Sequence, residues 1–262
     1  MSDVLVVCYH AVSAGWRSSL SLTPERLDAQ LRAILRRGYE GRTFTDAVTA
    51  PDAGRVLAVT FDDAYRSVLD HAKPVLDRLG IPATIFAPTG YIDAGMPLAW
   101  AGTDHWLTTE HAAELEPLSW AELRGLADEG WEVGSHTVSH PFLTELDDAA
   151  LAQELDASRQ ACEAGMGRPC TSLAYPYGAV DARVVAAAGR AGYVAAGTLP
   201  KRLHAEEPLA WPRVGLYERD AAWRLRLKVD RSARRLRSSG AWDALEAVRR
   251  HVTVRRVGQA VA

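Results

Sequence analysis

The sequence predicts an α/β protein built on a parallel β-sheet or a β/α barrel. Short apolar runs alternate with helical patterns along most of the 262 residues, and the turns between them are short. In addition, five polar or aromatic residues stand at or just past the ends of predicted strands, where both folds place their chemistry. This shared placement favours the β/α barrel, and the residues are His10, Asp62, Asp63, His136 and Tyr177.

The individual elements follow from apolar spacing and from end signals. Helices are indicated where apolar residues recur with helical spacing, with Thr23 and Ser119 as N-caps and Gly38 and Gly80 as stops. Glu122, three residues after Ser119, completes a capping box. The predicted strands are 4–8, 56–61, 83–87, 131–134, 172–175, 193–197 and 214–217, and the predicted helices are 24–37, 64–79, 119–129, 147–164 and 181–191.

Two stretches depart from this alternation. Residues 90–118 contain Trp100, Trp106 and several Gly and Pro, which indicates an excursion or lid. Residues 224–256 carry eleven Lys and Arg against three acids, an excess of eight positive charges in a chain of formal net charge −3. The body is therefore acidic and the tail basic, and we expect a catalytic domain over residues 1–218 followed by a basic helical extension over 219–262.

Composition excludes several classes of protein. Residues 1–9 include an acid and no basic cluster, their apolar run is too short for a signal peptide, and no other stretch approaches a membrane span. We therefore expect a cytoplasmic protein. Three cysteines without a CxxC spacing argue against a disulfide framework or a cysteine zinc site. Nucleic acid is not an expected partner, because the body is acidic and no recognition motif is present.

The motif that carries the most chemistry is Thr60-Phe61-Asp62-Asp63, at the end of an apolar strand. Adjacent carboxylates are costly at the mouth of a buried strand unless a cation or a reaction requires them. His136 and His140 follow another predicted strand. A lone histidine is more often a core or capping residue, but two imidazoles and a carboxylate form a three-ligand site for zinc or another divalent ion, leaving the second carboxylate to act as a base.

These residues resemble the motifs of the polysaccharide deacetylase family, also called the NodB homology domain or carbohydrate esterase family 4. Thr60-Phe61-Asp62-Asp63 is similar to its first motif, and residues 136–140, His-Thr-Val-Ser-His, are similar to its second. The resemblance covers roughly residues 4–217. It implies a distorted β/α barrel of the NodB type, Asp62 as general base, and a divalent metal, zinc or else cobalt or nickel, on Asp63, His136 and His140. The implied reaction is hydrolysis of an N-acetyl group on an amino sugar.

The third family motif is altered in this chain. The family commonly has Arg-x-Pro-Tyr, in which the arginine orients the base and the tyrosine N–H binds the oxyanion, whereas residues 174–177 read Ala-Tyr-Pro-Tyr. Tyr177 retains the backbone donor, but Ala174 provides no cation. Arg213 is our candidate replacement, with a surface arginine as the alternative reading.

The later family motifs are not evident in this chain. Instead, the first strand ends in Tyr9-His10-Ala11-Val12. This stretch resembles the Tyr-His-x-Val start of a family branch in which the general-acid histidine comes from the amino end of the chain. His10 is thus the expected acid, with a strand-end histidine bonded to the backbone as the alternative. Trp100, Trp106 and Trp211 are candidate sugar-stacking walls.

The expected substrate is an N-acetylated saccharide, sugar nucleotide, lipid-linked sugar or metabolite-linked sugar. The basic extension is a solvated helical face or, alternatively, a contact with an anionic membrane or lipid-linked substrate. Two other functions stay open from the sequence. A non-catalytic carbohydrate-binding member of the fold is consistent with Ala174, and a non-haem iron oxygenase is consistent with the two histidines and one carboxylate.

Overall fold

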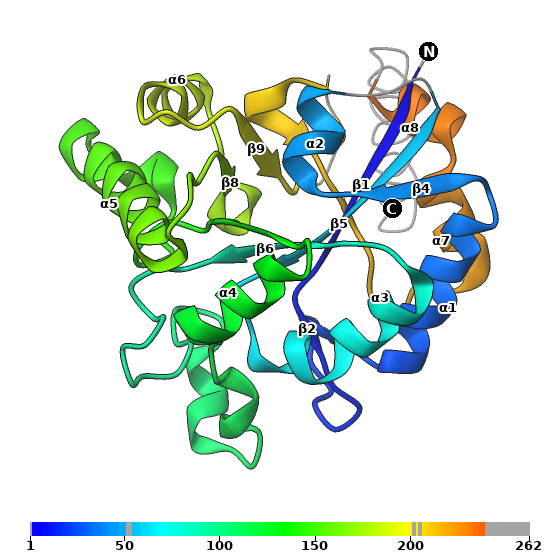
Figure 1. Cartoon of the computed structure of the whole chain (residues 1–262), viewed down its shortest axis with the longest axis horizontal. Helices are drawn as coiled ribbons and strands as arrows, with labels where there is room; N and C mark the ends of the chain where they lie inside the picture. Colours follow the sequence, from blue (N-terminus) through cyan, green and yellow to red (C-terminus); the bar gives the residue numbers. More distant parts are fainter. Residues whose placement is uncertain (1, 51–53, 201–202, 204–205, 239–262) are drawn as a thin grey trace, which may run out of the picture.

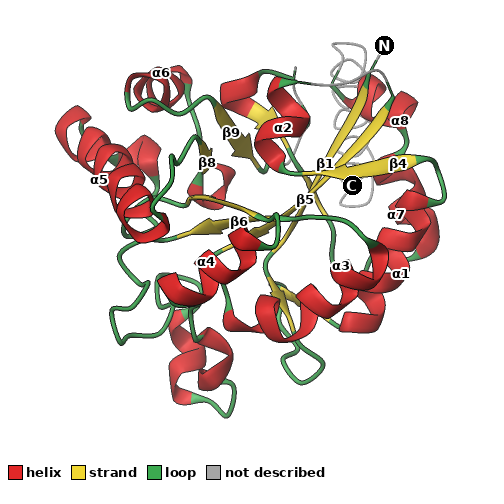
Figure 2. Ribbon diagram, viewed as in Figure 1, coloured by secondary structure: helices red, strands yellow, loops and turns green. Residues whose placement is uncertain are grey.

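The computed structural model describes residues 2–50, 54–200, 203 and 206–238. Its centre is a sheet of parallel strands surrounded by helices (Figure 1, Figure 2). The order of the strands along this sheet is β10-β9-β8-β7-β6-β5-β1-β11, and β4 pairs with the first half of β5. The strand bounds are β1 (Asp3–Tyr9), β4 (Tyr39–Arg42), β5 (Arg55–Asp62), β6 (Thr84–Ala87), β7 (Glu132–Ser135), β8 (Ser172–Ala174), β9 (Ala195–Thr198), β10 (Trp211–Pro212) and β11 (Val214–Gly215).

One short segment joins the two ends of this sheet. Trp211 pairs with Gly197 of β9, and Val214, three residues later, pairs with Val7 of β1. The chain from 211 to 215 therefore bridges the first and last strands, and the sheet curls into a distorted barrel. The predicted barrel is confirmed, and Arg213 stands at the break between the two bridging strands.

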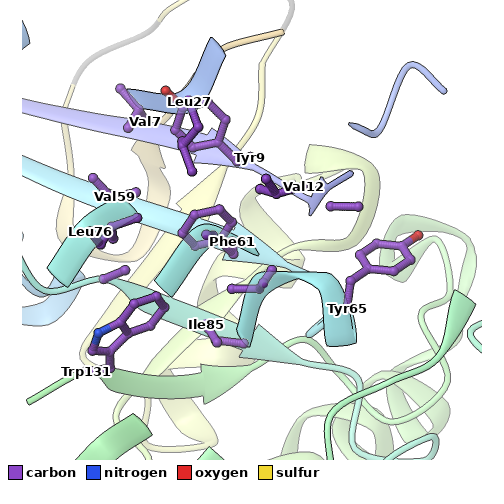
Figure 3. Close-up of a cluster of buried hydrophobic side chains, with 14 of the residues drawn as sticks. Val7, Tyr9, Val12, Leu27, Val59, Phe61, Tyr65, Leu76, Ile85 and Trp131 are labelled. Atoms are coloured by element: carbon purple, nitrogen blue, oxygen red, sulfur yellow. The ribbon is translucent and has the colours of Figure 1, made fainter. Parts of the chain in front are cut away.

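The helices cover the outside of the barrel. Fourteen residues of the outer core are drawn in Figure 3, where the outward side chains of β1, β5 and β6, among them Val7, Phe61 and Ile85, meet Leu27 and Leu76 from the helices. Outward and inward residues alternate along each strand, so Val4, Val6 and Ala58 belong to a separate interior cluster. The helices are α1 (Pro24–Leu35), α2 (Phe44–Thr49), α3 (Lys73–Leu79), α4 (Trp120–Asp128), α5 (Asp148–Met166), α6 (Ala182–Arg190), α7 (Ala222–Val229) and α8 (Arg231–Arg237).

Helix boundaries largely follow the end signals in the sequence. The Thr23 hydroxyl caps α1, Ser119 and Glu122 form the capping box of α4, and Gly80 ends α3 in the left-handed conformation. The helix predicted over 64–79 begins later than expected. Asp63 and Ala64 have positive φ angles of 70° and 54°, and a π-helical turn at Val68–Ala72 precedes α3.

Several short elements were not predicted. They are β4, α2, the two-residue pair β2 (Ala11–Val12) and β3 (Ser21–Leu22), and β10. Helix α2 contacts β1, β5 and β9, so it covers the end of the barrel at which the strands begin. Two-residue strands have no measurable period, which explains why sequence patterns did not reveal them.

The predicted lid, residues 90–118, forms two 3₁₀ turns at Asp104–Thr108 and Ala112–Leu115. It is tied down at both ends, because the Gly90 N–H donates to the Val138 carbonyl and the Leu118 N–H donates to the Ala64 carbonyl. The loop of residues 13–20, between β2 and β3, and this segment project on the same side of the molecule in Figure 1.

The described part of the basic extension packs on the barrel. Leu225 and Val229 of α7 belong to the main core, and Arg234 of α8 pairs with Asp3 at the start of β1. Residues 239–262 lie outside the described residues, so the domain boundary at residue 218 stays a prediction. Trp223 and Leu227 of α7 are exposed beside arginines, and contact of this face with an anionic membrane also stays a prediction. Among the described helices, none is both long enough and apolar enough to cross a membrane.

The bridge at Arg213 requires a glycine on the neighbouring strand. A Cβ atom built on Gly197 would lie 2.6 Å from Nε and 2.7 Å from Cδ of Arg213. We predict that Gly197→Ala lowers the free energy of unfolding by about 1–3 kcal/mol, because the buried arginine has to move. Urea unfolding followed by circular dichroism measures this. Gly125→Ala, at an open helical position, is the matched control and should stabilise by up to about 1 kcal/mol. Equal effects at the two positions would contradict the steric account.

Candidate active site

The two adjacent carboxylates point to different partners because the backbone turns between them. Asp62 is the last residue of β5, and its carboxylate lies inside the barrel with that of Asp63. Asp63 has a φ of 70°, a left-handed conformation that few non-glycine residues adopt. Asp62 therefore faces Arg213, whereas Asp63 faces His136 and His140.

Arg213 binds Asp62 with two hydrogen bonds. Its terminal nitrogens donate to Oδ1 at 2.6 Å and to Oδ2 at 2.8 Å, and both side chains are buried. The other donors are also used, since Nε donates to the Thr198 carbonyl at 3.2 Å and Nη1 donates to Thr60 Oγ1 at 3.1 Å. The guanidinium lies 5.4 Å from the Phe86 ring centre. A bidentate pair whose members make further hydrogen bonds is the form in which opposite charges are tolerated inside a protein.

This pairing sets the charge of Asp62. Burial by itself would raise the pKa of this carboxyl, but Arg213, with a smaller contribution from His136, holds the pKa well below its usual range. Burial by itself would lower the pKa of Arg213, but the charge and hydrogen bonds of Asp62, together with Cys8 and Asp63, outweigh it and leave this pKa raised. Asp62 is therefore ionised at neutral pH and oriented for accepting a proton.

A glutamate fixes the backbone of the loop that carries His136 and His140. Oε2 of Glu154, on α5, accepts the backbone N–H groups of Val138 and Ser139 at 2.8 and 3.1 Å, and Oε1 accepts the Ser139 hydroxyl at 2.6 Å. Thr137 and His140 adopt positive φ angles of 68° and 60°. Such strained conformations persist only where surrounding bonds fix them, and here they bring both imidazoles to Asp63.

Asp63, His136 and His140 offer three ligand atoms within 4.8 Å of one another. Each histidine Nε2 lies 3.4 Å from Asp63 Oδ1. His136 Nδ1 lies 2.8 Å from the Ala174 carbonyl, so Nδ1 carries the proton and Nε2 offers its lone pair. Asp63 Oδ1 is buried and has no hydrogen-bond partner in the part of the chain that the structure describes. A divalent cation between these atoms would satisfy that oxygen, so the residues fit the implied metal.

The protonation of the two histidines differs. Burial lowers the pKa of His140 to about 3, so its ring is neutral at physiological pH. Burial also lowers the pKa of His136, but its close contact with the Asp63 carboxylate, together with the charge of Asp62, outweighs burial and leaves the pKa raised. Metal ligands must be deprotonated, so a cation has to displace a proton from His136 when the pH is low.

The carboxylates and histidines open into a cavity of about 290 Å³. Trp100 forms part of its wall and stacks on His140 at a ring-centre distance of 4.1 Å, and Tyr177 meets His140 edge-on at 4.6 Å. The predicted lid supplies Trp106 as a further wall residue. The lining residues are His10, Arg17, Ser18, Ser19, Leu20, Asp62, Asp63, Trp100, Ala101, Gly102, Thr103, His105, Trp106, His136, His140, Tyr177, Gly178 and Leu199.

The structure brings the predicted acid and oxyanion donor to this cavity. A ring nitrogen of His10 lies within 4.8 Å of ligand atoms on Asp62 and Cys8. Tyr177 has a φ of 59°, and this turn places it in the cavity wall. Arg213 lies behind Asp62, as described above. Their catalytic roles belong to the proposal below.

One predicted substrate-binding residue is misplaced. Trp211 is 6% exposed and packs in the interior cluster with Val4, Phe86 and Ala195 rather than lining the cavity. It precedes Arg213 by two residues, so both side chains share the inner face of the bridging segment. Each residue advances a strand by roughly 3.3 Å, so the side chain of Trp211 lies two residues deeper in the barrel than that of Arg213. Its assignment as a sugar-stacking wall is therefore wrong.

Sequence reasoning also missed residues that the fold brings to the site. The sequence pattern assigns Cys8 no place in the site, yet its thiol lies 3.4 Å from Asp62 Oδ2. Its period-two spacing from Val4 and Val6 and to His10 would have placed it on the inner face of β1. Arg17 and Leu199 line the cavity without any sequence signal, because they lie in irregular segments.

The model of the family described as polysaccharide deacetylase matches residues 49–196, more than half of the chain. The chain belongs to the polysaccharide deacetylase family. This membership confirms the resemblance drawn from the two motifs, and the (β/α) barrel with its site at the strand ends agrees with it.

Curated relatives of this deacetylase-family chain are distant. YxkH of Bacillus subtilis strain 168, provisionally named a polysaccharide deacetylase, is 26% identical over 193 residues, or 72% of this chain and 61% of that protein. The poly-beta-1,6-N-acetyl-D-glucosamine N-deacetylase of Staphylococcus aureus strain N315 is 24% identical over 136 residues, or 48% of this chain and 42% of that protein. The chain thus spans about two fifths to three fifths of the length of these relatives.

Solved structures of deacetylases share the fold. The Streptococcus pyogenes deacetylase PplD, in complex with acetate, has a TM-score of 0.73 at 19% identity and covers 87% of this chain and 98% of its own. The polysaccharide deacetylase BC0361 from Bacillus cereus has a TM-score of 0.70 at 24% identity, covering 87% of this chain and 69% of its own. At such identities the likeness establishes the barrel, and the chemistry has to be argued from the residues.

The three-ligand arrangement predicts selective loss of metal. We expect His136→Ala to lower zinc affinity by more than about 100-fold, because removal of an outer-shell partner alone costs about 10–100-fold. Calorimetric titration of zinc into metal-free protein at pH 7 measures this. His71→Ala, an exposed histidine on the π-helical turn, is the control and should bind zinc normally. Equal affinity of both variants would contradict the ligand assignment.

The lowered pKa of Asp62 predicts a pH-dependent contribution to stability. A carboxyl whose folded pKa lies below its unfolded value stabilises the fold above the unfolded pKa, about 4, and this contribution is lost as the pH falls through the folded pKa. Between pH 5 and pH 3, wild type should lose about 1 kcal/mol more than the double variant Asp62→Asn with Arg213→Gln. Urea unfolding at each pH is the measurement. Asp128→Asn, which alters an exposed ion pair, should match wild type.

Proposed function

We propose that the protein is a metal-dependent hydrolase that removes an N-acetyl group from an amino sugar. The observation that carries this is the division of the two carboxylates. Asp62 is held ionised by Arg213, and Asp63 completes a three-ligand set with His136 and His140, at one end of an aromatic-walled cavity. Family membership supports the same reaction, and the S. aureus relative is named for N-deacetylation of a polymer of N-acetylglucosamine.

The residues of the site supply the proton transfers that amide hydrolysis needs. A bound divalent ion would supply an acidified water and polarise the acetyl carbonyl. Asp62, ionised and fixed by Arg213, accepts the proton of the attacking water. The Tyr177 backbone N–H donates to the developing oxyanion, a role supported by the position of Tyr177 in the cavity wall. His10, near Asp62 on the cavity wall, protonates the departing amine of the sugar.

The contact between Arg213 and Asp62 weakens the alternative that the protein is a non-catalytic carbohydrate-binding member of the family. The alternative of a non-catalytic protein rests on Ala174, because alanine stands where the third family motif usually has its arginine. The structure provides a different cation for the same carboxylate, delivered from the bridging segment. The small Ala174 side chain belongs to the interior cluster with Phe86, over which the guanidinium lies. The base is therefore supported without the usual arginine.

A substitution at Asp62 tests the proposal. Asp62→Asn should lower the rate of acetate release by about 100-fold or more, because the base is lost, while zinc content stays near one ion per chain because the ligand set is intact. Enzyme-coupled acetate detection and metal analysis of the same preparation measure both quantities. Asp128→Asn is the surface control. Unchanged hydrolysis by Asp62→Asn with metal bound would overturn the assignment of the base.

The substrate and the metal are identified by a screen. N-acetylated oligosaccharides, sugar nucleotides and lipid-linked saccharides would be incubated with the protein and Zn²⁺, Co²⁺ or Ni²⁺, and the loss of 42 mass units per acetyl group followed by mass spectrometry. The same screen includes formylated sugars, since the cavity wall does not by itself select acetyl. Full metal loading with no loss of any acyl group would favour a non-catalytic binding protein.

A further inference from the structure

The cavity has a cationic rim that the proposed reaction does not use. The loop of residues 13–20 contributes Arg17, Ser18, Ser19 and Leu20 to the cavity lining. Arg17 is the one lysine or arginine among the described residues that line the cavity. Its side chain is exposed, whereas Arg213 is buried beneath Asp62. Arg17 can therefore contact a ligand in the cavity, whereas Arg213 contacts Asp62.

The loop that carries Arg17 is anchored by two residues that precede Arg17, Ser13 and Trp16. Trp16, its neighbour, is 2% exposed and packs against Tyr65 and Trp106 at ring-centre distances of 5.7 Å each. The Ser13 hydroxyl accepts the N–H groups of residues 15 and 16 and donates to Glu114 Oε1 at 2.6 Å. Arg17 consequently starts from a fixed backbone position at the cavity, and little conformational entropy of the loop is lost when a ligand binds.

Arg17 carries an uncompensated charge. Many other arginines of the described chain, such as Arg66, Arg183 and Arg231, have a carboxylate within 4 Å. No hydrogen-bond or ion-pair partner of Arg17 is present among the described residues. The acids that line the described cavity are Asp62 and Asp63, of which one is neutralised by Arg213 and the other belongs to the metal-ligand set.

We propose that Arg17 selects N-acetylated saccharides that carry an anionic group, a phosphate or a carboxylate, next to the acetylated sugar. This inference rests on the proposed function for the identity of the sugar. A neutral hydroxyl needs only a neutral hydrogen-bonding partner, whereas the guanidinium fork matches the paired oxygens of a phosphate or a carboxylate. With Asp62 already neutralised, no free carboxylate in the cavity repels such a group.

Binding measurements separate this inference from the proposed reaction. Zinc-loaded protein would be titrated calorimetrically with three forms of one N-acetylglucosamine disaccharide: neutral, carrying a phosphate monoester, and carrying a carboxylate. Wild type, Arg17→Ala and Arg17→Lys would be compared, with Arg190→Ala as a control that removes an exposed arginine outside the cavity lining. The phosphate and carboxylate arms show which anion the site takes.

Wild type should bind at least one anionic form about 10–100-fold more tightly than the neutral form at low salt. Arg17→Ala should abolish this preference and leave affinity for the neutral form within about threefold, Arg17→Lys should restore it in part, and Arg190→Ala should keep it. The same ratios are expected in kcat/KM for acetate release.

A wild-type protein with no anionic preference, or a preference that Arg17→Ala retains, would overturn the inference even if acetate is released from neutral sugars. Conversely, absence of acetate release from all three forms would count against the proposed function alone, because the binding ratios come from the titration and not from acetate release.

Discussion

The ion pair between Asp62 and Arg213 is the constraint to which the barrel interior is adapted. Two buried charges are tolerated when they pair closely and make further hydrogen bonds, and here the guanidinium donates to both carboxylate oxygens, to Thr60 and to the Thr198 carbonyl. The surrounding sequence provides the space. Gly197 has no side chain where Arg213 passes, and the bridging segment between β9 and β1 breaks its pairing at Arg213 itself.

The same interaction explains how two adjacent aspartates perform separate functions. A regular strand would place them on opposite faces of the sheet, with one carboxylate in the outer apolar core. The left-handed turn at Asp63 keeps both on the inner side, and similar turns at Thr137, His140 and Tyr177 bring the remaining groups toward them. The backbone strain of the molecule is therefore concentrated where the chemistry is, and bonds such as those from Glu154 sustain it.

Much of the fold and the centre of the site could be predicted from sequence because their signals are local. Strand and helix alternation predicts the barrel, and the Asp62-Asp63 and His136-x-x-x-His140 motifs each occupy a few consecutive residues. Arg213 could be proposed only because Ala174 left a carboxylate without a cation. Trp211 was placed wrongly because sequence shows which face of a strand a residue occupies but not its depth along the barrel. Cys8 and Arg17 depend on contacts between distant segments, which no periodicity encodes.

The charged groups at the floor of the cavity, such as Asp62 and Arg213, are paired, whereas Arg17 at its rim is not paired within the described part of the chain. This difference has a structural cause. At the floor, the bridging segment fixes Asp62 against Arg213, so the proton-accepting carboxylate depends little on what the loops contain. At the rim, the loop of residues 13–20 and the lid are attached to each other through Ser13 with Glu114 and Trp16 with Trp106. Loop residues can therefore change with the substrate while the floor stays intact, the usual relation between a rigid scaffold and its binding loops. An unpaired arginine on such a loop is thus read as a determinant of what enters the cavity rather than of what happens there.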